Sequence, residues 1–199
     1  GLGIGDDYPP RIMGVLNVSR ESPYDPSVFA DPDEAADYVE DMIDAGADII
    51  DVGLESANKR LDVLSADQER ERLETAIETI EAVEGEAVFS IETRYSEVAA
   101  AALEGGFDMV NDICGFADPE MPTVCENHDA AVVKMASPPD LQRPGAVEEI
   151  DWTERCDESW AAAADYVDQV YEALKRGGFT EQTIVDPAFG GWSEAQTME

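Results

Sequence analysis

The sequence predicts an α/β fold with a parallel sheet, of the (β/α)8 TIM-barrel type, because two kinds of segment alternate along the chain. Short apolar runs of strand length are separated by longer segments that carry helix start and stop signals. Apolar strands separated by helices indicate parallel pairing with right-handed crossovers. The six expected strands cover residues 12–16, 48–52, 86–91, 108–113, 130–135 and 183–185.

The first two helices are marked by capping residues. Asp31 is expected to cap a helix that has Pro32 at its first position and ends at Gly46. Ser65 and Gln68 have the spacing of a capping box, which opens a helix running to about residue 85.

The later helices carry similar but weaker signals. Ser96 is expected to cap a short Ala-rich helix, and Asp118 followed by proline opens another. Residues 151–176 are expected to form a long helix closed by two glycines. Two segments echo each other, GADIIDVG at 46–53 and GFDMVNDICG at 106–115, each with a helix-ending glycine, an apolar strand and a polar end.

Polar residues at the carboxyl ends of the expected strands favour a barrel over an open sheet. No G-x-G-x-x-G or P-loop follows a strand, which weakens the nucleotide-binding open sheet, whereas convergent polar groups fit the catalytic face of a barrel. We expect residues 1–199 to form one barrel domain of about six βα units, two short of closure, with exposed first and sixth strands. The strand-end residues are Asn17, Asp51, Glu55, Glu92, Asn111, Asp112, Lys134 and Asp186.

The charge balance excludes several classes of partner. The 46 acidic residues outnumber the 12 basic ones, and the formal net charge is −34. Such a chain does not bind nucleic acid or an anionic membrane through a general basic surface. The acids are dispersed and lysine is scarce, which indicates a halophilic protein working in molar salt, where the Debye length is roughly 3 Å. The alternative is an acidic protein from ordinary salt.

Cysteine and histidine usage excludes further chemistries. Cys114, Cys125 and Cys156 lack C-x-x-C spacing, so we expect reduced cysteines in a cytoplasmic protein. His128 is the single histidine, which excludes a His-rich zinc site. It precedes a strand, so we expect it at a helix end or on the surface, away from the strand carboxyl ends.

Five segments in chain order resemble the pterin-binding barrel family, which includes the dihydropteroate synthases. They are MGVLNVSRESPYD (13–25), DIIDVGLES (48–56), IETRYSEVAAAAL (91–103), MVNDICG (109–115) and IVDPAFGG (184–191). The resemblance implies a (β/α)8 barrel that joins 4-aminobenzoate to 6-hydroxymethyl-7,8-dihydropterin diphosphate in folate biosynthesis. It also implies Mg²⁺ at the diphosphate, and we expect a homodimer.

The resemblance assigns roles to individual strand-end residues. Asn17 matches an asparagine near the metal and the diphosphate, and Glu92 stands where the family has a pterin-binding aspartate. Asn111 and Asp186 match pterin-binding residues, while Met135 matches an apolar residue that lines the pterin pocket.

The loops depart from the family pattern. The T-P-D-S-F-S-D segment is SRESPYD at 19–25, and E-S-T-R-P-G becomes E-S-A-N-K-R at 55–60, which leaves Lys59 or Arg60 to take the anion. No residue is assigned a catalytic role. Two alternatives stay open: a pterin- or folate-binding barrel in one-carbon (methyl) transfer, or a non-catalytic paralogue acting as a binding subunit.

The dispersed acids predict a strong dependence of stability on salt. Because salt screens the mutual repulsion of the carboxylates, the melting temperature should rise by many degrees between low salt and molar KCl. Thermal unfolding followed by circular dichroism measures this shift. A melting temperature indifferent to salt would contradict the halophilic interpretation.

Overall fold

The computed structural model describes residues 1–18, 28–29, 31–55, 63–136 and 171–187, and every structural statement below concerns these residues. Of the long helix expected over 151–176, residues 171–175 are helical and the part before 171 lies outside the described residues. No helix in the described ranges is long and apolar enough to cross a bilayer.

The described strands form one parallel sheet in chain order. Its neighbours run β1-β2-β3-β4-β5-β6, which confirms the predicted parallel six-stranded architecture. Val15 on edge strand β1 is 50% exposed and Val185 on edge strand β6 is 45% exposed, as expected for the two edges. The strands are β1 (Met13–Asn17), β2 (Ile49–Gly53), β3 (Val88–Glu92), β4 (Met109–Asp112), β5 (Ala131–Met135) and β6 (Thr183–Asp186).

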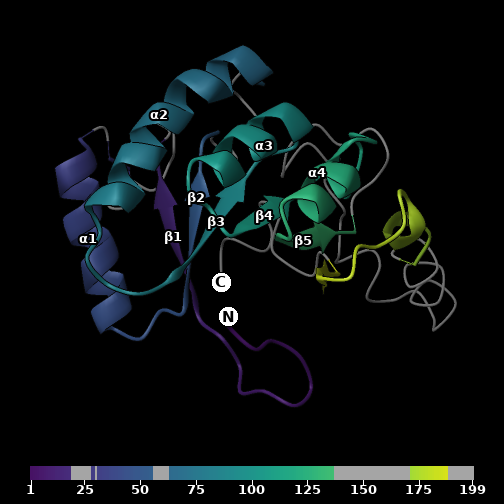
Figure 1. The fold of residues 1–199 in the computed structure, drawn as a ribbon, viewed down its shortest axis with the longest axis horizontal. Helices are drawn as coiled ribbons and strands as arrows, with labels where there is room; N and C mark the ends of the chain where they lie inside the picture. The colour runs from purple at the N-terminus through teal and green to yellow at the C-terminus, as the bar shows by residue number, and fades with distance from the viewer. Residues whose placement is uncertain (19–27, 30, 56–62, 137–170, 188–199) are drawn as a thin grey trace, which may run out of the picture.

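Four helices connect the strands and lie along one side of the sheet (Figure 1). They are α1 (Pro32–Asp44), α2 (Ala66–Ala82), α3 (Ser96–Glu104) and α4 (Met121–Asn127). The Asp31 carboxylate caps α1 by accepting from two backbone amides, and Ser65 with Gln68 forms the predicted capping box of α2. Helix α2 ends at Ala82, about three residues before the predicted end.

The prediction for the start of α3 was wrong. The N-cap of α3 is Tyr95, whose side chain makes no capping hydrogen bond, and Ser96 is the first helical residue. The carboxylate of Asp118 instead accepts from the backbone N–H of Ser96 at 2.9 Å and from that of Glu120 at 3.0 Å. One carboxylate therefore serves the start of α3 and the turn before α4, so α4 begins at Met121 rather than directly after Asp118.

The two faces of the sheet carry different kinds of side chain, because successive residues of a strand point to opposite faces. One set of apolar residues, fully buried, packs against the helices and forms the core. The other set points away from the helices, and it carries Asn17, Asp51, Glu92, Asn111 and Asp186. The helix-facing core residues of the strands are Leu16, Ile50, Val52, Ile91, Val110 and Val132.

Lys134 and Asp112 belong to the helix-facing set, which corrects the expectation that all strand-end polar groups converge. The Asp112 carboxylate accepts from the backbone N–H of Cys114 at 2.8 Å and of Phe116 at 2.7 Å, so it shapes the loop after β4. Lys134 is fully buried, and its ammonium lies over the rings of Phe116 and Phe179. That ammonium donates to the carbonyls of Leu174, Arg176 and Gly178.

Lys134 should therefore be essential to the stability of the last strand and helix. Replacing it by methionine leaves carbonyls at a helix end without their donor, and we expect a loss of about 2–4 kcal/mol of unfolding free energy. Denaturant unfolding in molar KCl measures the loss. The control is Lys175→Met, which removes a half-exposed ion pair with Glu172 and should cost about 0.5 kcal/mol or less. Equal losses of unfolding free energy in the two variants would refute this stabilising role of Lys134.

Candidate functional site

The strand ends bring residues of four neighbouring strands into one row, and three of the four are polar. Asn17 pairs in register with Gly53, Gly53 with Glu92, and Glu92 with Asn111. Partners in register on parallel strands point to the same face, here the face away from the helices. Three of the predicted site residues, Asn17, Glu92 and Asn111, therefore share one end and one face of the sheet.

The other two described site residues continue the same face on the last two strands. Met135 of β5 pairs in register with Asp186 of β6, and the Asp186 carbonyl accepts from the backbone N–H of Ala136 at 2.8 Å. Met135 is only 2% exposed, whereas Asp186 is partly exposed. An apolar side chain and a carboxylate thus lie next to each other at this end of the row. Lys59 and Arg60 lie outside the described residues.

Gly53 is the smallest residue of the row, and a larger side chain at this position would collide with Asn17. A Cβ atom at this position would lie 2.6 Å from Oδ1 of Asn17, which is closer than any real side chain tolerates. The Asn17 carboxamide therefore lies against the backbone of β2, in space that a side chain at position 53 would fill. The glycine in the D-V-G sequence of β2 thus permits the position of Asn17.

Asp51 lies on the same face one step deeper and connects three strands. Its carboxylate accepts from the hydroxyl of Ser90 on β3 at 2.6 Å and from Nδ2 of Asn111 on β4 at 2.8 Å. Asp51 is 5% exposed and Ser90 is fully buried. Sequence reasoning noticed Asp51 as a strand-end polar residue but gave it no role. The available signal was an acid inside an apolar strand, which is costly unless it is hydrogen-bonded.

The acids of this face have shifted proton affinities. Burial, together with the negative charges of Asp51, Glu69 and Glu55, raises the pKa of Glu92 to about 8. Burial also raises the pKa of Asp51, but the hydrogen bonds from Ser90 and Asn111 act in the opposite direction. With a pKa of about 8, Glu92 is largely protonated at neutral pH, and a protonated carboxyl can donate a hydrogen bond.

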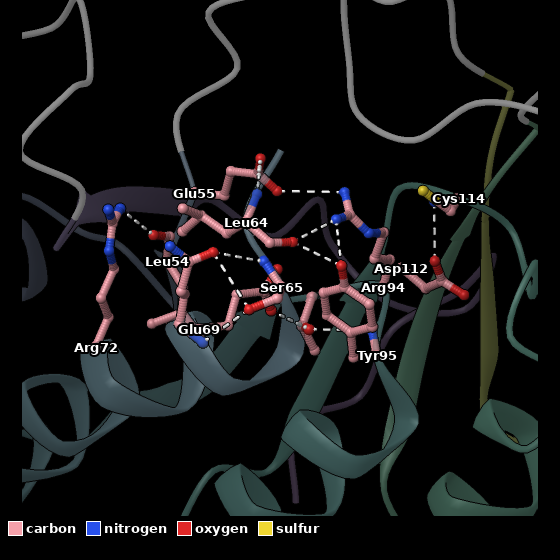
Figure 2. A network of polar contacts seen from close by, with 12 residues as sticks. Leu54, Glu55, Leu64, Ser65, Glu69, Arg72, Arg94, Tyr95, Asp112 and Cys114 are labelled. Atoms are coloured by element: carbon pink, nitrogen blue, oxygen red, sulfur yellow. Dashed lines mark hydrogen bonds and ion pairs between the residues drawn. The ribbon is translucent and has the colours of Figure 1, made fainter. Parts of the chain in front are cut away.

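A second network joins the end of β2 to the loop after β3 (Figure 2). Glu55 accepts from the backbone N–H of Leu64 at 3.0 Å and pairs with the guanidinium of Arg94 at 3.3 Å. Arg94 and the hydroxyl of Tyr95 both donate to the Leu64 carbonyl, at 2.7 and 2.6 Å. These contacts tie together the two residues that flank the segment carrying Lys59 and Arg60.

Glu69 supports this region from the helix side. It is 2% exposed on α2 and accepts from the hydroxyl of Thr93, the residue after Glu92, at 2.6 Å. Burial raises the pKa of Glu69 to about 7, although Thr93 and Arg94 act to lower it. The end of β3 is thus held from both faces of the sheet.

The remaining titratable candidates do not join the site. Cys114 and Cys125 are free and buried, and burial raises the pKa of each thiol to about 12, which makes both unreactive. Cys156 lies outside the described residues. His128 is exposed at the end of α4 with Nδ1 2.9 Å from the Val124 carbonyl, which confirms the prediction for this residue.

Comparison with known proteins identifies similar chains. A profile described as pterin binding enzyme matches residues 13–198. A probable bifunctional folylpolyglutamate synthase/dihydropteroate synthase from Haloferax volcanii is 36% identical over 98% of this chain. A dihydropteroate synthase from Clostridium beijerinckii is 32% identical over 94% of it. The solved structure of the Coxiella burnetii dihydropteroate synthase in complex with pteroic acid superposes with a TM-score of 0.64, at 26% identity over 91% of this chain.

The chain spans only part of these relatives. It covers 23% of the Haloferax protein, 66% of the Clostridium protein and 62% of the Coxiella chain.

Buried acids with raised pKa values predict that stability falls as the pH rises. Between its unfolded pKa of 4.5 and its folded pKa of about 7, Glu69 binds more protons in the folded protein. Its contribution is present below pH 4.5 and is lost as the pH passes 7. We expect Glu69→Gln to remove a decline of about 1–3 kcal/mol between pH 5 and 9.

Thermal and denaturant unfolding across this pH range, in molar KCl, measures the slope. The exposed Glu78 on the same helix supplies the control, and Glu78→Gln should leave the slope as it is in the wild type. A wild-type stability that stays level or rises from pH 5 to 9 would show the raised pKa to be wrong.

Proposed function

Because the chain belongs to the pterin binding enzyme family, we propose that it is the barrel domain of a dihydropteroate synthase. It would join 4-aminobenzoate to 6-hydroxymethyl-7,8-dihydropterin diphosphate, with residues 1–199 as one domain. The observation that carries this proposal is the row of polar residues on one face at the strand carboxyl ends, Asn17 with Glu92 and Asn111, continued by Met135 and Asp186.

The proposed pterin site combines polar and apolar groups. The amino-pyrimidinone edge of a pterin offers N–H donors beside a carbonyl and ring-nitrogen acceptors. The Asp186 carboxylate can accept from the donors, and the Asn111 amide can do both. A protonated Glu92 adds a donor, and the buried Met135 supplies an apolar contact for the flat ring.

The proposed reaction is a substitution at the methylene carbon of the pterin. The bond from this carbon to the diphosphate oxygen breaks, a bond to the amine nitrogen of 4-aminobenzoate forms, and the amine loses a proton. Positive charge develops on the methylene carbon as diphosphate leaves. The carboxylates of this face, Asp51 and Asp186, would stabilise that charge because they are already in place when it appears.

Asn17 fits the requirements of the expected Mg²⁺. Its amide oxygen is a hard donor held at the end of β1 against Gly53. Within the described residues no group of three or more His, Cys, Asp or Glu side chains forms a metal cage. Mg²⁺ commonly uses one or two protein oxygens together with waters and substrate phosphates, and it would neutralise the leaving diphosphate. Asn17 is thus proposed as the residue that holds it.

Lys59 and Arg60 are proposed to meet the anionic substrates. Both follow Glu55 in the chain, and the contacts of Glu55 and Arg94 with Leu64 hold the two ends of their segment together. Because Glu55 and Leu64 are in contact, the segment between them begins and ends close to the strand ends.

The proposed enzyme is halophilic, cytoplasmic and homodimeric. The net charge of −34 and the free Cys114 and Cys125 support the first two properties. The dimer is an expectation to be tested by light scattering in molar salt.

Replacing Asp186 tests the proposed site. We expect Asp186→Ala, in the complete natural protein that contains this chain, to weaken pteroic acid binding by roughly ten- to a hundredfold, or about 1.5–3 kcal/mol. The carboxylate would lose charge-assisted hydrogen bonds to the pterin edge. Titration calorimetry in molar KCl measures the affinity.

The control for this experiment is Asp118→Ala. Asp118 serves two backbone amides at helix starts, so its loss should cost about 1 kcal/mol of stability and leave the affinity unchanged. Equal affinities of the wild type and Asp186→Ala would remove Asp186 from the site. Pterin binding without release of diphosphate, in the presence of 4-aminobenzoate, would favour the one-carbon-transfer alternative.

A further inference from the structure

The contact between Asp51 and Asn111 spans the sheet from β2 to β4. Asp51 pairs in register with Ser90 on the intervening strand, and the Asn111 side chain reaches back over that strand. The nearest residue above this contact on β3 is Glu92, in register with Asn111. The contact therefore connects Asn111, a member of the row proposed to bind the pterin, to Asp51, which lies one step deeper on the same face.

An asparagine amide has two ends of similar shape and opposite hydrogen-bonding character. Which end faces a ligand is decided by the partner of the other end. In the structure Nδ2 of Asn111 points to Oδ2 of Asp51 at 2.8 Å, and the Ser90 hydroxyl donates to Oδ1 of Asp51 at 2.6 Å. An ionised carboxylate only accepts, so it selects the NH₂ end of the amide and leaves the carbonyl end for other contacts.

The hydrogen bonds of Asp51 favour its role as an acceptor. Burial raises the pKa of Asp51, but the hydrogen bonds from Ser90 and Asn111 act in the opposite direction. Both donors point at the Asp51 carboxylate, at 2.6 and 2.8 Å, so its two oxygens accept in this structure.

We propose that Asp51 is a positioning residue, which fixes the Asn111 amide so that its carbonyl oxygen and its second N–H face the ligand in one defined order. The inference rests on the proposed function, since the ligand is taken to be a pterin. Without Asp51 the amide could rotate by half a turn and present donor and acceptor in the reverse order. Asp51 thus acts on specificity through Asn111 and needs no contact of its own with the ring.

The position of Asp112 shows that this role does not follow from burial alone. Asp112 is also a buried aspartate near a strand end, and it also accepts two hydrogen bonds. Its partners are backbone amides of the loop after β4, on the helix-facing side. A general effect of removing a buried carboxylate should therefore appear at Asp112, whereas an effect on Asn111 should appear only at Asp51.

A double-mutant cycle in the complete natural protein tests the inference. Pteroic acid binding is measured by calorimetry in molar KCl for the wild type, Asp51→Ala, Asn111→Ala and the double variant. We expect each single variant to bind about tenfold more weakly, and the double variant to bind no more weakly than Asn111→Ala. Asp51→Asn should bind within about threefold of the wild type, because its amide oxygen can accept from Asn111 while its NH₂ donates to Ser90.

The control variant Asp112→Ala should lose stability and keep its affinity. Additive losses in the cycle, or an equal loss of affinity in Asp112→Ala, would overturn the positioning role. Because variants of buried acids can fold poorly, Ser90→Ala provides a milder test. It removes one donor from Asp51 and should weaken binding by about two- to threefold. An unchanged affinity in Ser90→Ala, with Asp51→Ala folded and also unchanged, would likewise overturn it.

A readout without ligand separates this inference from the proposed function. The side-chain amide signals of Asn111 in ¹⁵N-labelled protein should shift in Asp51→Ala and should stay near their wild-type positions in Asp51→Asn. If these shifts occur but the wild type does not bind pteroic acid, the proposed function fails and the orientation of Asn111 by Asp51 stands. If the signals do not respond to Asp51→Ala, the positioning role fails regardless of what the protein binds.

Discussion

Each strand of the sheet packs against helices on one face and presents the site on the other. The alternation of side chains along the strands is therefore the constraint on which the site depends. One set must be apolar because it packs against the helices, and the other set faces away from them. A slip of one residue would exchange the sets. The carboxylate of Asp51 and the amide of Asn111 would then meet the helices, and the apolar core would lose Ile50 and Val110.

Burying a carboxylate costs free energy, and the acids in the interior of this acidic chain are stabilised in two ways. Asp51 and Asp112 receive donors from side chains or from backbone amides. Glu92 instead has its pKa raised to about 8, so it avoids a buried charge by keeping a proton. The basic groups Arg94 and Lys134 donate to internal acceptors. In the proposed synthase, Mg²⁺, Lys59 and Arg60 would contribute to neutralising the diphosphate.

The sequence predicted the order and spacing of the strands because apolar runs and helix caps are local signals. It also predicted that Asn17, Glu92 and Asn111 share one edge, since strand ends of a parallel sheet meet there. It could not predict that Lys134 faces the helices, because the three carbonyls and two rings around it come from distant parts of the chain. The use of Asp118 at the start of α3 was missed for the same reason, as its partner Ser96 lies 22 residues away.

The end of β3 is where the separate networks meet. Ser90 donates to Asp51 on the site face, Thr93 donates to Glu69 on the helix face, and Arg94 joins Glu55 beyond the strand. Glu92 lies between these three contacts, and its strand pairs with β2 on one side and with β4 on the other. Its position is therefore set by groups on β2, on α2 and in the loop before α2.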